Sequence, residues 1–206
     1  MTNKNQFMKN IIGLAILALA FGCGGAKINQ SVGLANGTNG SGVIAMNTAA
    51  AQGSAEVSAV ISGFSTEKRV GGIISYLASD ELQGRETGSE GIEMAAEYIE
   101  TIFKSNGISP YFKTYRDTLT NFEKMAYNLV GFIEGSDQNL KNEYVIIGAH
   151  YDHIGTADPI ANDSIANGAN DNASGTTAVL EFARYFGKYR NNKRSVIFAL
   201  FSGEEK

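Results

Sequence analysis

Three short segments of this chain carry imidazole and carboxylate side chains, the groups that bind metal ions where no sulfur is used. Each segment supplies one candidate ligand: His150, Asp171 and Glu205. One nitrogen and two oxygen ligands suit zinc in a catalytic site that keeps a position for water, and manganese or cobalt could substitute for it. The three segments are Gly148-Ala-His-Tyr-Asp-His153, Gly168-Ala-Asn-Asp-Asn-Ala-Ser-Gly175 and Phe201-Ser-Gly-Glu-Glu205.

The elements around these segments would bring the candidate ligands together. Tyr144–Ala149 and Ser195–Phe201 are continuous apolar runs, as in strands buried on both faces of a helix-covered sheet. Ser174–Phe186 has the apolar spacing of a helix. The histidine and the glutamates follow the strands, and Asp171 precedes the helix. Because ligands of open α/β sheets gather outside the carboxyl ends of the strands, we expect one shared crevice.

The chain from about residue 65 onward predicts further elements in α/β order. Helices are expected over about 70–77 and from Ser89 or Glu90 to about Gly107, with a polar loop at Asp80–Gly91 between them. Strands are expected at 111–119 and 128–133. We therefore predict an α/β fold with a mixed, partly parallel sheet flanked by helices. The helix residues expected to face the core are Val70, Ile73, Ile74, Leu77, Ile92, Ala96, Ile99, Phe103, Val179, Phe182, Ala183 and Phe186.

Residues beside the candidate ligands can support the same chemistry. Asp152 can accept a hydrogen bond from the second ring nitrogen of His150, which would fix the tautomer of the imidazole. Of the pair Glu204 and Glu205, one glutamate can bind metal while the other takes a proton from water. Taken singly, such residues are more often loop, cap or surface residues; their coincidence at strand ends favours a site. His153 is interpreted as an ordinary loop residue.

The amino-terminal part of the chain predicts export. Residues 1–23 begin with basic residues and continue into an apolar run too short to span a bilayer, as in a secretory signal. Cys23 stands where bacterial lipoproteins carry a lipidated cysteine, which would anchor the protein at a membrane outside the cytoplasm. Ala20 and Phe21 depart from the usual lipobox, and the alternative is a short buried helix with an inert cysteine. Residues 24–64, rich in Gly, Ala, Ser and Asn, are expected to form a flexible tether.

Composition narrows the classes of function. The net charge is -4 at pH 7 and no Lys/Arg cluster is present, which argues against a nucleic-acid partner. Cys23 is the only cysteine, so the chain can form neither an intrachain disulfide nor a thiolate zinc site. Residues 65–206 are left as the globular, function-bearing part.

Together the three segments resemble the cocatalytic, di-zinc aminopeptidase family of the bacterial leucyl aminopeptidase type. Carboxypeptidase-like enzymes and glutaminyl cyclases are relatives of that family. The resemblance runs from about Glu67 to Lys206 and includes the segment 77–91, Leu-Ala-Ser-Asp-Glu-Leu-Gln-Gly-Arg-Glu-Thr-Gly-Ser-Glu-Gly. It implies that residues 65–206 form the amino-terminal portion of a zinc peptidase domain.

The resemblance also implies a role for each matching residue. His150 would bind the first zinc, Asp171 would bridge the two ions, and Glu205 would bind the second. Glu204 would be the general base that takes a proton from water, and Asp152 would orient His150.

The sequence departs from the family pattern at its end. In the family a further aspartate and a further histidine complete the zinc ligands later in the chain, whereas this sequence ends at Lys206. The resemblance therefore implies an incomplete fragment with weakened zinc binding and impaired activity. We also expect the last strand, Ser195–Phe201, to be an unprotected apolar edge.

The leading hypothesis is an exported zinc exopeptidase that hydrolyses peptides, an aminopeptidase in preference to a carboxypeptidase. A single-zinc glutaminyl cyclase relative is the first alternative, and the segment 168–175 favours the two-metal branch over it. A noncatalytic binding ectodomain on the same fold is the second alternative; retention of both Asp171 and Glu204 counts against it.

Overall fold

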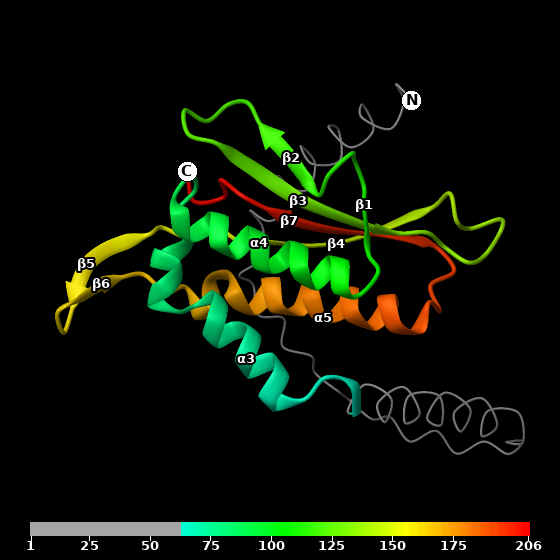
Figure 1. Cartoon of the computed structure of the whole chain (residues 1–206), viewed down its shortest axis with the longest axis horizontal. Helices are drawn as coiled ribbons and strands as arrows, with labels where there is room; N and C mark the ends of the chain where they lie inside the picture. The colour runs from blue at the N-terminus through cyan, green and yellow to red at the C-terminus, as the bar shows by residue number, and fades with distance from the viewer. Residues whose placement is uncertain (1–62) are drawn as a thin grey trace, which may run out of the picture. The chain divides into compact units, whose positions relative to one another are not determined.

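The computed structural model describes residues 63–206 of the chain (Figure 1). The expected signal sequence, Cys23 and nearly all of the expected tether lie outside the described residues, so export and lipidation remain predictions. Within residues 63–206, no helix is both long enough and apolar enough to cross a membrane.

A five-stranded mixed sheet forms the centre of this part of the chain, which confirms the predicted fold class. Its middle strand β7 (Ser195–Phe201) runs antiparallel to β3 (Ala126–Ile133) and parallel to β4 (Tyr144–His150). Both β1 (Ser109–Pro110) and β2 (Arg116–Leu119) pair with β3. A separate hairpin, unexpected from the sequence, projects from the domain (Figure 1). Its strands are β5 (Thr156–Ile160) and β6 (Asp163–Ile165).

Two expectations about these strands are wrong. The strand Ser195–Phe201 is not an exposed edge, because it is paired on both sides and its residues are buried except for the last. The run Tyr144–Ala149 was expected to be buried on both faces, but β4 is an edge strand among the described strands and its side chains are only half-buried, with Val145 42% exposed. An apolar run thus predicts a strand reliably but does not tell its place in the sheet.

Side-chain caps mark the starts of the next two helices, of which the first begins earlier than the predicted range of about 70–77. Thr66 caps α3 (Glu67–Leu77), and the Ser89 hydroxyl accepts a hydrogen bond from the Ile92 amide at the start of α4 (Glu90–Ser105). The segment between them was expected to be a loop but contains a short 3-10 helix, η1 (Asp80–Arg85).

The helices α4 and α5 (Ser174–Tyr189) pack against each other and on the sheet, α4 on β3 and α5 on β4 and β7. Leu77, Ile99 and Phe103 are among the helix residues fully buried in the core, as expected. The inward placement expected for Phe182 is wrong, since this side chain is 49% exposed.

Candidate metal centre

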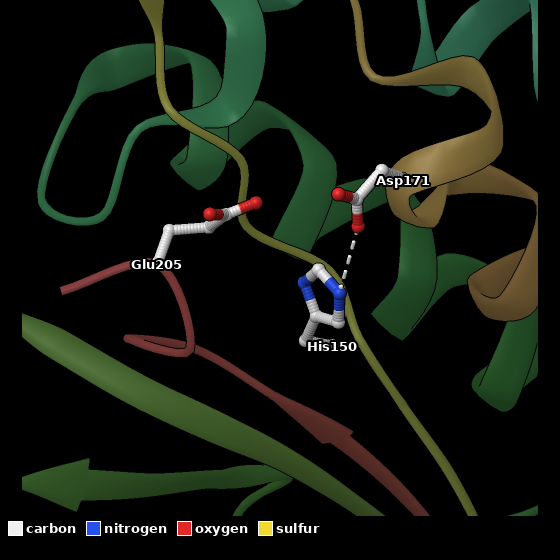
Figure 2. Close-up of side chains that lie close together, drawn as sticks. All are labelled: His150, Asp171 and Glu205. Atoms are coloured by element: carbon white, nitrogen blue, oxygen red, sulfur yellow. Dashed lines mark ion pairs between the residues drawn. The ribbon is translucent and has the colours of Figure 1, made fainter. Parts of the chain in front are cut away.

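The structure brings His150, Asp171 and Glu205 together although they are far apart in sequence (Figure 2). One potential ligand atom from each residue lies within 4.8 Å of the other two. Nε2 of His150 is 3.1 Å from Oδ1 of Asp171. In Figure 2 the imidazole and the two carboxylates point toward a common space. The three side chains therefore come together as their places at the strand and helix ends predicted, while their roles as metal ligands remain a prediction.

The fold explains this meeting by its parallel strand pair. His150 ends β4 and pairs in register with Phe201, the last residue of β7, so the residues that follow β7 emerge beside it. Asp171 lies in a π-helical turn, η2 (Ala169–Ala173), immediately before α5. The hydroxyl of Thr176, in the first turn of α5, donates a 2.9 Å hydrogen bond to the backbone oxygen of His150. This bond ties the helix start to the strand end.

The three residues fit a zinc ion by type and by spacing. Zinc–ligand bonds of about 2.0–2.2 Å keep any two ligands of one ion less than about 4.4 Å apart. The separations here, within 4.8 Å, approach that range, so a small inward movement of the side chains would suffice. The Asp171 side chain is 60% exposed and can make such a movement without disturbing the core.

Asp152 lies directly beneath this site and is fully buried. Its Oδ2 accepts hydrogen bonds from the Thr87 hydroxyl at 2.9 Å and from the Gly203 amide at 3.0 Å. Its Oδ1 makes no hydrogen bond and lies 3.6 Å from Nδ1 of His150. The sequence thus correctly predicted this neighbour of the ring, but the hydrogen-bonding distance, 3.2 Å, is from Nδ1 to the backbone oxygen of Asp152. A backbone oxygen only accepts, so Nδ1 carries a proton.

The side chains of His150 and Asp152 affect each other's ionisation. Burial lowers the pKa of His150, but the neighbouring Asp152 carboxylate and the charge of Glu204 outweigh burial and leave this pKa above its ordinary value. Burial raises the pKa of Asp152, yet the His150 ring and the Thr87 hydroxyl outweigh burial and leave this pKa below its ordinary value. Asp152 is therefore a carboxylate at neutral pH, the form that orients a metal-binding imidazole.

Glu204, the expected general base, is exposed and directly precedes the candidate ligand Glu205. Its negative charge helps to raise the pKa of His150. The structure thus puts Glu204 next to the candidate ligands without assigning it a role.

His153 was interpreted as a loop residue, but the structure places it against a candidate ligand. Its Nδ1 lies 2.9 Å from Oε1 of Glu205, and its side chain is only 13% exposed. The ring also packs against Gly168, where a Cβ atom would come within 2.6 Å of His153 Cδ2. The sequence signal for His153 was its place in His-Tyr-Asp-His, which holds both histidines of the chain.

Sequence reasoning also missed two buried polar residues, one at the end of η1 and one just after it. Arg85 is 1% exposed and Thr87 is 5% exposed. Burial lowers the pKa of Arg85, and the carboxylates of Asp152 and Asp171 oppose that shift. The segment was predicted to be a polar loop and was noted as part of a family resemblance, and nothing in its polar, glycine-rich composition indicated burial.

Comparison with known proteins adds to this geometry. Residues 128–206 match the model of Peptidase family M28. A protein of Arthroderma otae described as a probable leucine aminopeptidase is 30% identical over 125 residues, which cover 58% of this chain and 31% of that protein. A protein of Pyrenophora tritici-repentis described as a probable zinc metalloprotease is 37% identical over 78 residues, which cover 38% of this chain and 17% of that protein.

Among solved structures, the glutaminyl cyclase of Porphyromonas gingivalis aligns with a TM-score of 0.52 at 16% identity. The alignment covers 68% of this chain and 48% of that one. At this identity the likeness concerns the fold, and it agrees with the mixed sheet and helices described above.

The mixed α/β sheet, with an imidazole and carboxylates gathered at its strand ends, is the arrangement expected of a zinc exopeptidase. Residues 128–206, which carry all of these side chains, belong to peptidase family M28. The chain spans less than a third of the length of the two curated relatives above.

Proposed function

We propose that this protein is a zinc-dependent exopeptidase that removes amino-terminal residues from peptides. The observation that supports this most is the meeting of His150, Asp171 and Glu205 within 4.8 Å at the carboxyl ends of β4 and β7. The similarity to proteins described as leucine aminopeptidases favours amino-terminal over carboxyl-terminal cleavage. Export through residues 1–23, with anchoring through Cys23, belongs to the same proposal and would place the substrates outside the cytoplasm.

His150, Asp171 and Glu205 would hold the metal, and Asp171 would be shared if two zinc ions are bound. Bound zinc would polarise the peptide carbonyl and lower the pKa of a water molecule. The protein's own groups do the rest. The proton on Nδ1 of His150, directed at the backbone oxygen of Asp152, leaves Nε2 for the metal side of the ring.

Glu204 would take the proton. A carboxylate oxygen of this exposed side chain would accept it from the attacking water and return it to the amine that leaves when the peptide bond breaks. Its neighbour Glu205 is held by His153 and would bind metal. The two glutamates would thus have different roles. Glu205, held by its contact with His153, would bind metal, and the exposed Glu204 would take the proton.

The test uses the full chain with zinc, leucine p-nitroanilide as substrate, and the variant Glu204→Gln. General bases contribute about 10²–10⁴-fold, so we expect zinc-dependent release of p-nitroaniline that falls at least about 100-fold in the variant. Glu134→Gln is the matched control, because Glu134 is an exposed glutamate whose side chain is 69% accessible. Its turnover should equal that of the wild type.

Other outcomes separate the alternatives. Release of ammonia from a peptide with amino-terminal glutamine, without peptide-bond cleavage, would replace the peptidase by a glutaminyl cyclase. A chain that binds no zinc in calorimetry would favour the noncatalytic ectodomain. Equal turnover in Glu204→Gln and wild type would remove Glu204 as the base.

A further inference from the structure

Arg85 connects the two loops that carry candidate metal ligands. Its side chain is almost completely buried, and all of its hydrogen bonds go to backbone oxygens. Nε donates to the oxygen of Tyr151 at 3.0 Å. Nη1 donates to the oxygen of Asn167 at 2.8 Å and also to that of Leu77, and Nη2 donates to the oxygen of Gly168 at 3.1 Å.

These carbonyl groups belong to three separate segments. Tyr151 directly follows His150, and Gly168 begins the turn that presents Asp171. Leu77 is the last residue of α3. One guanidinium therefore fixes the spacing between the loop of the imidazole and the loop of the exposed carboxylate.

The backbone around Arg85 extends the same connection. The Arg85 oxygen accepts a 3.1 Å hydrogen bond from the amide of His153, and the Gly84 oxygen accepts one of 3.1 Å from Gly155. Arg85 has a φ of 48°, a left-handed conformation that is unfavourable for a residue with a side chain. The guanidinium reaches all four carbonyl groups from this backbone conformation.

Only arginine can make this set of contacts. Its planar guanidinium presents five N–H donors in a rigid fork, whereas a lysine ammonium offers three donors at one point. Buried carbonyl oxygens that lose their donors cost free energy, so the loops would move to find water or other partners. The positive charge also lies near the carboxylates of Asp152 and Asp171 and balances part of their charge.

We propose that Arg85 is a positioning residue of the metal centre, which holds His150 and Asp171 at metal-binding distance by clamping their two loops. This inference rests on the proposed function, because it assumes that the site takes zinc. It goes beyond that function by assigning the spacing of the ligands to a side chain that touches none of them. If Arg85 were needed only for folding, its substitution would destabilise the whole domain as much as the site.

The test compares Arg85→Lys with Arg190→Lys in the full chain. Arg190 is the matched control, because it also donates to backbone oxygens, those of Gly107 at 2.7 Å and Gly187 at 3.1 Å, but contacts none of the site residues. Zinc affinity is measured by competition with a chromophoric chelator. Hydrogen exchange of the metal-free protein follows the amides of 150–153 and 166–172 against those of β7 as an internal reference.

Removal of an outer partner of a metal ligand typically weakens metal affinity 10–100-fold. We therefore expect Arg85→Lys to bind zinc about 10–100-fold more weakly and to lose protection in the two loops, with β7 and the far-UV circular dichroism unchanged. Arg190→Lys should match the wild type in every measurement.

Wild-type zinc affinity together with wild-type loop protection in Arg85→Lys would overturn the proposal. Global unfolding of Arg85→Lys would overturn it too, since the residue would then hold the fold and not the site. Absence of zinc binding by the wild type would refute the proposed function instead. In that case loss of loop protection in metal-free Arg85→Lys would still support the clamp, and its retention would reject it.

Discussion

Two aspartates lie on opposite sides of the His150 ring in opposite surroundings. Asp171 approaches Nε2 at 3.1 Å with a side chain that is 60% exposed, whereas Asp152 approaches Nδ1 at 3.6 Å and is fully buried. We call His150, Asp171 and Glu205 the outer layer. The inner layer consists of Thr87 and Asp152, which lie beneath the loops that Arg85 connects.

The two layers differ in where their hydrogen bonds go. In the inner layer, the buried Asp152 carboxylate accepts hydrogen bonds from the Thr87 hydroxyl and the Gly203 amide. In the outer layer, a carboxylate oxygen of Asp171 faces the ring of His150, and one of Glu205 faces the ring of His153. The inner layer should therefore carry stability and the outer layer metal affinity, and variants in each layer can test that division.

The largest expected effect is on the inner layer. Asp152→Asn removes a buried negative charge and places an amide N–H group beside the Thr87 hydroxyl and the Gly203 amide, which donate to Asp152 in the wild type. We therefore expect a loss of about 3 kcal/mol in the free energy of unfolding. Urea unfolding of the metal-free protein at pH 7 measures it. A loss below about 1 kcal/mol would mean that the inner layer contributes little to stability.

The counterpart is Asp171→Asn in the outer layer. An exposed substitution changes stability by no more than about 0.5 kcal/mol. Loss of a directly binding carboxylate should weaken zinc affinity at least about 100-fold, which equals about 2.7 kcal/mol. The same urea titration and a chelator competition provide both numbers. If Asp171→Asn destabilises the metal-free protein as strongly as Asp152→Asn does, the division between the layers is wrong.

The difference between the layers also separates what the sequence could predict from what it could not. The outer layer could be predicted because its residues sit at strand and helix ends, and parallel strands bring such ends together. Asp152 could be predicted because it lies only two residues from His150. These features are local in sequence and need only the fold class.

The rest depends on packing that no local pattern reveals. Arg85 and Thr87 reach the site from a segment more than 60 residues away. Arg85 donates to the backbone oxygen of Tyr151 and Thr87 donates to the carboxylate of Asp152, and no local sequence pattern predicts either contact. The edge position of β4 depends on which strands pair, and the apolar sequences of β4 and β7 are alike in that respect. The contact between His153 and Glu205 depends on how the loops after β4 and β7 pass each other.

His153 tests whether the outer layer has a support of its own. His153→Phe removes the group that contacts Oε1 of Glu205, and we expect zinc affinity to fall about 10-fold, the lower end for an outer partner. His153→Asn places an amide nitrogen near the position of Nδ1 and should restore most of that loss. Equal affinities for Phe and Asn would mean that the contact does not orient Glu205.

The smallest expected effect concerns Glu100 on α4, which belongs to neither layer. Its Oε1 lies 2.6 Å from Nε of Arg116 and its Oε2 lies 2.8 Å from Nζ of Lys104. Burial raises the pKa of Glu100, but these two cations outweigh it and leave the pKa below its ordinary value. The carboxylate therefore stabilises the fold above the pKa of the unfolded chain, and this contribution is lost as the pH falls through the folded pKa.

Glu100→Gln should lower the free energy of unfolding by about 0.5–1 kcal/mol at pH 7, since the pair is only partly buried. The difference from wild type should shrink under acid and disappear below the folded pKa, which urea unfolding from pH 7 to pH 3 would reveal. Zinc affinity should not change, because the Glu100 carboxylate accepts hydrogen bonds from Lys104 and Arg116, neither of which belongs to either layer. A change in zinc affinity here would show that metal binding responds to general stability, and the assignment of affinity to the outer layer would then fail.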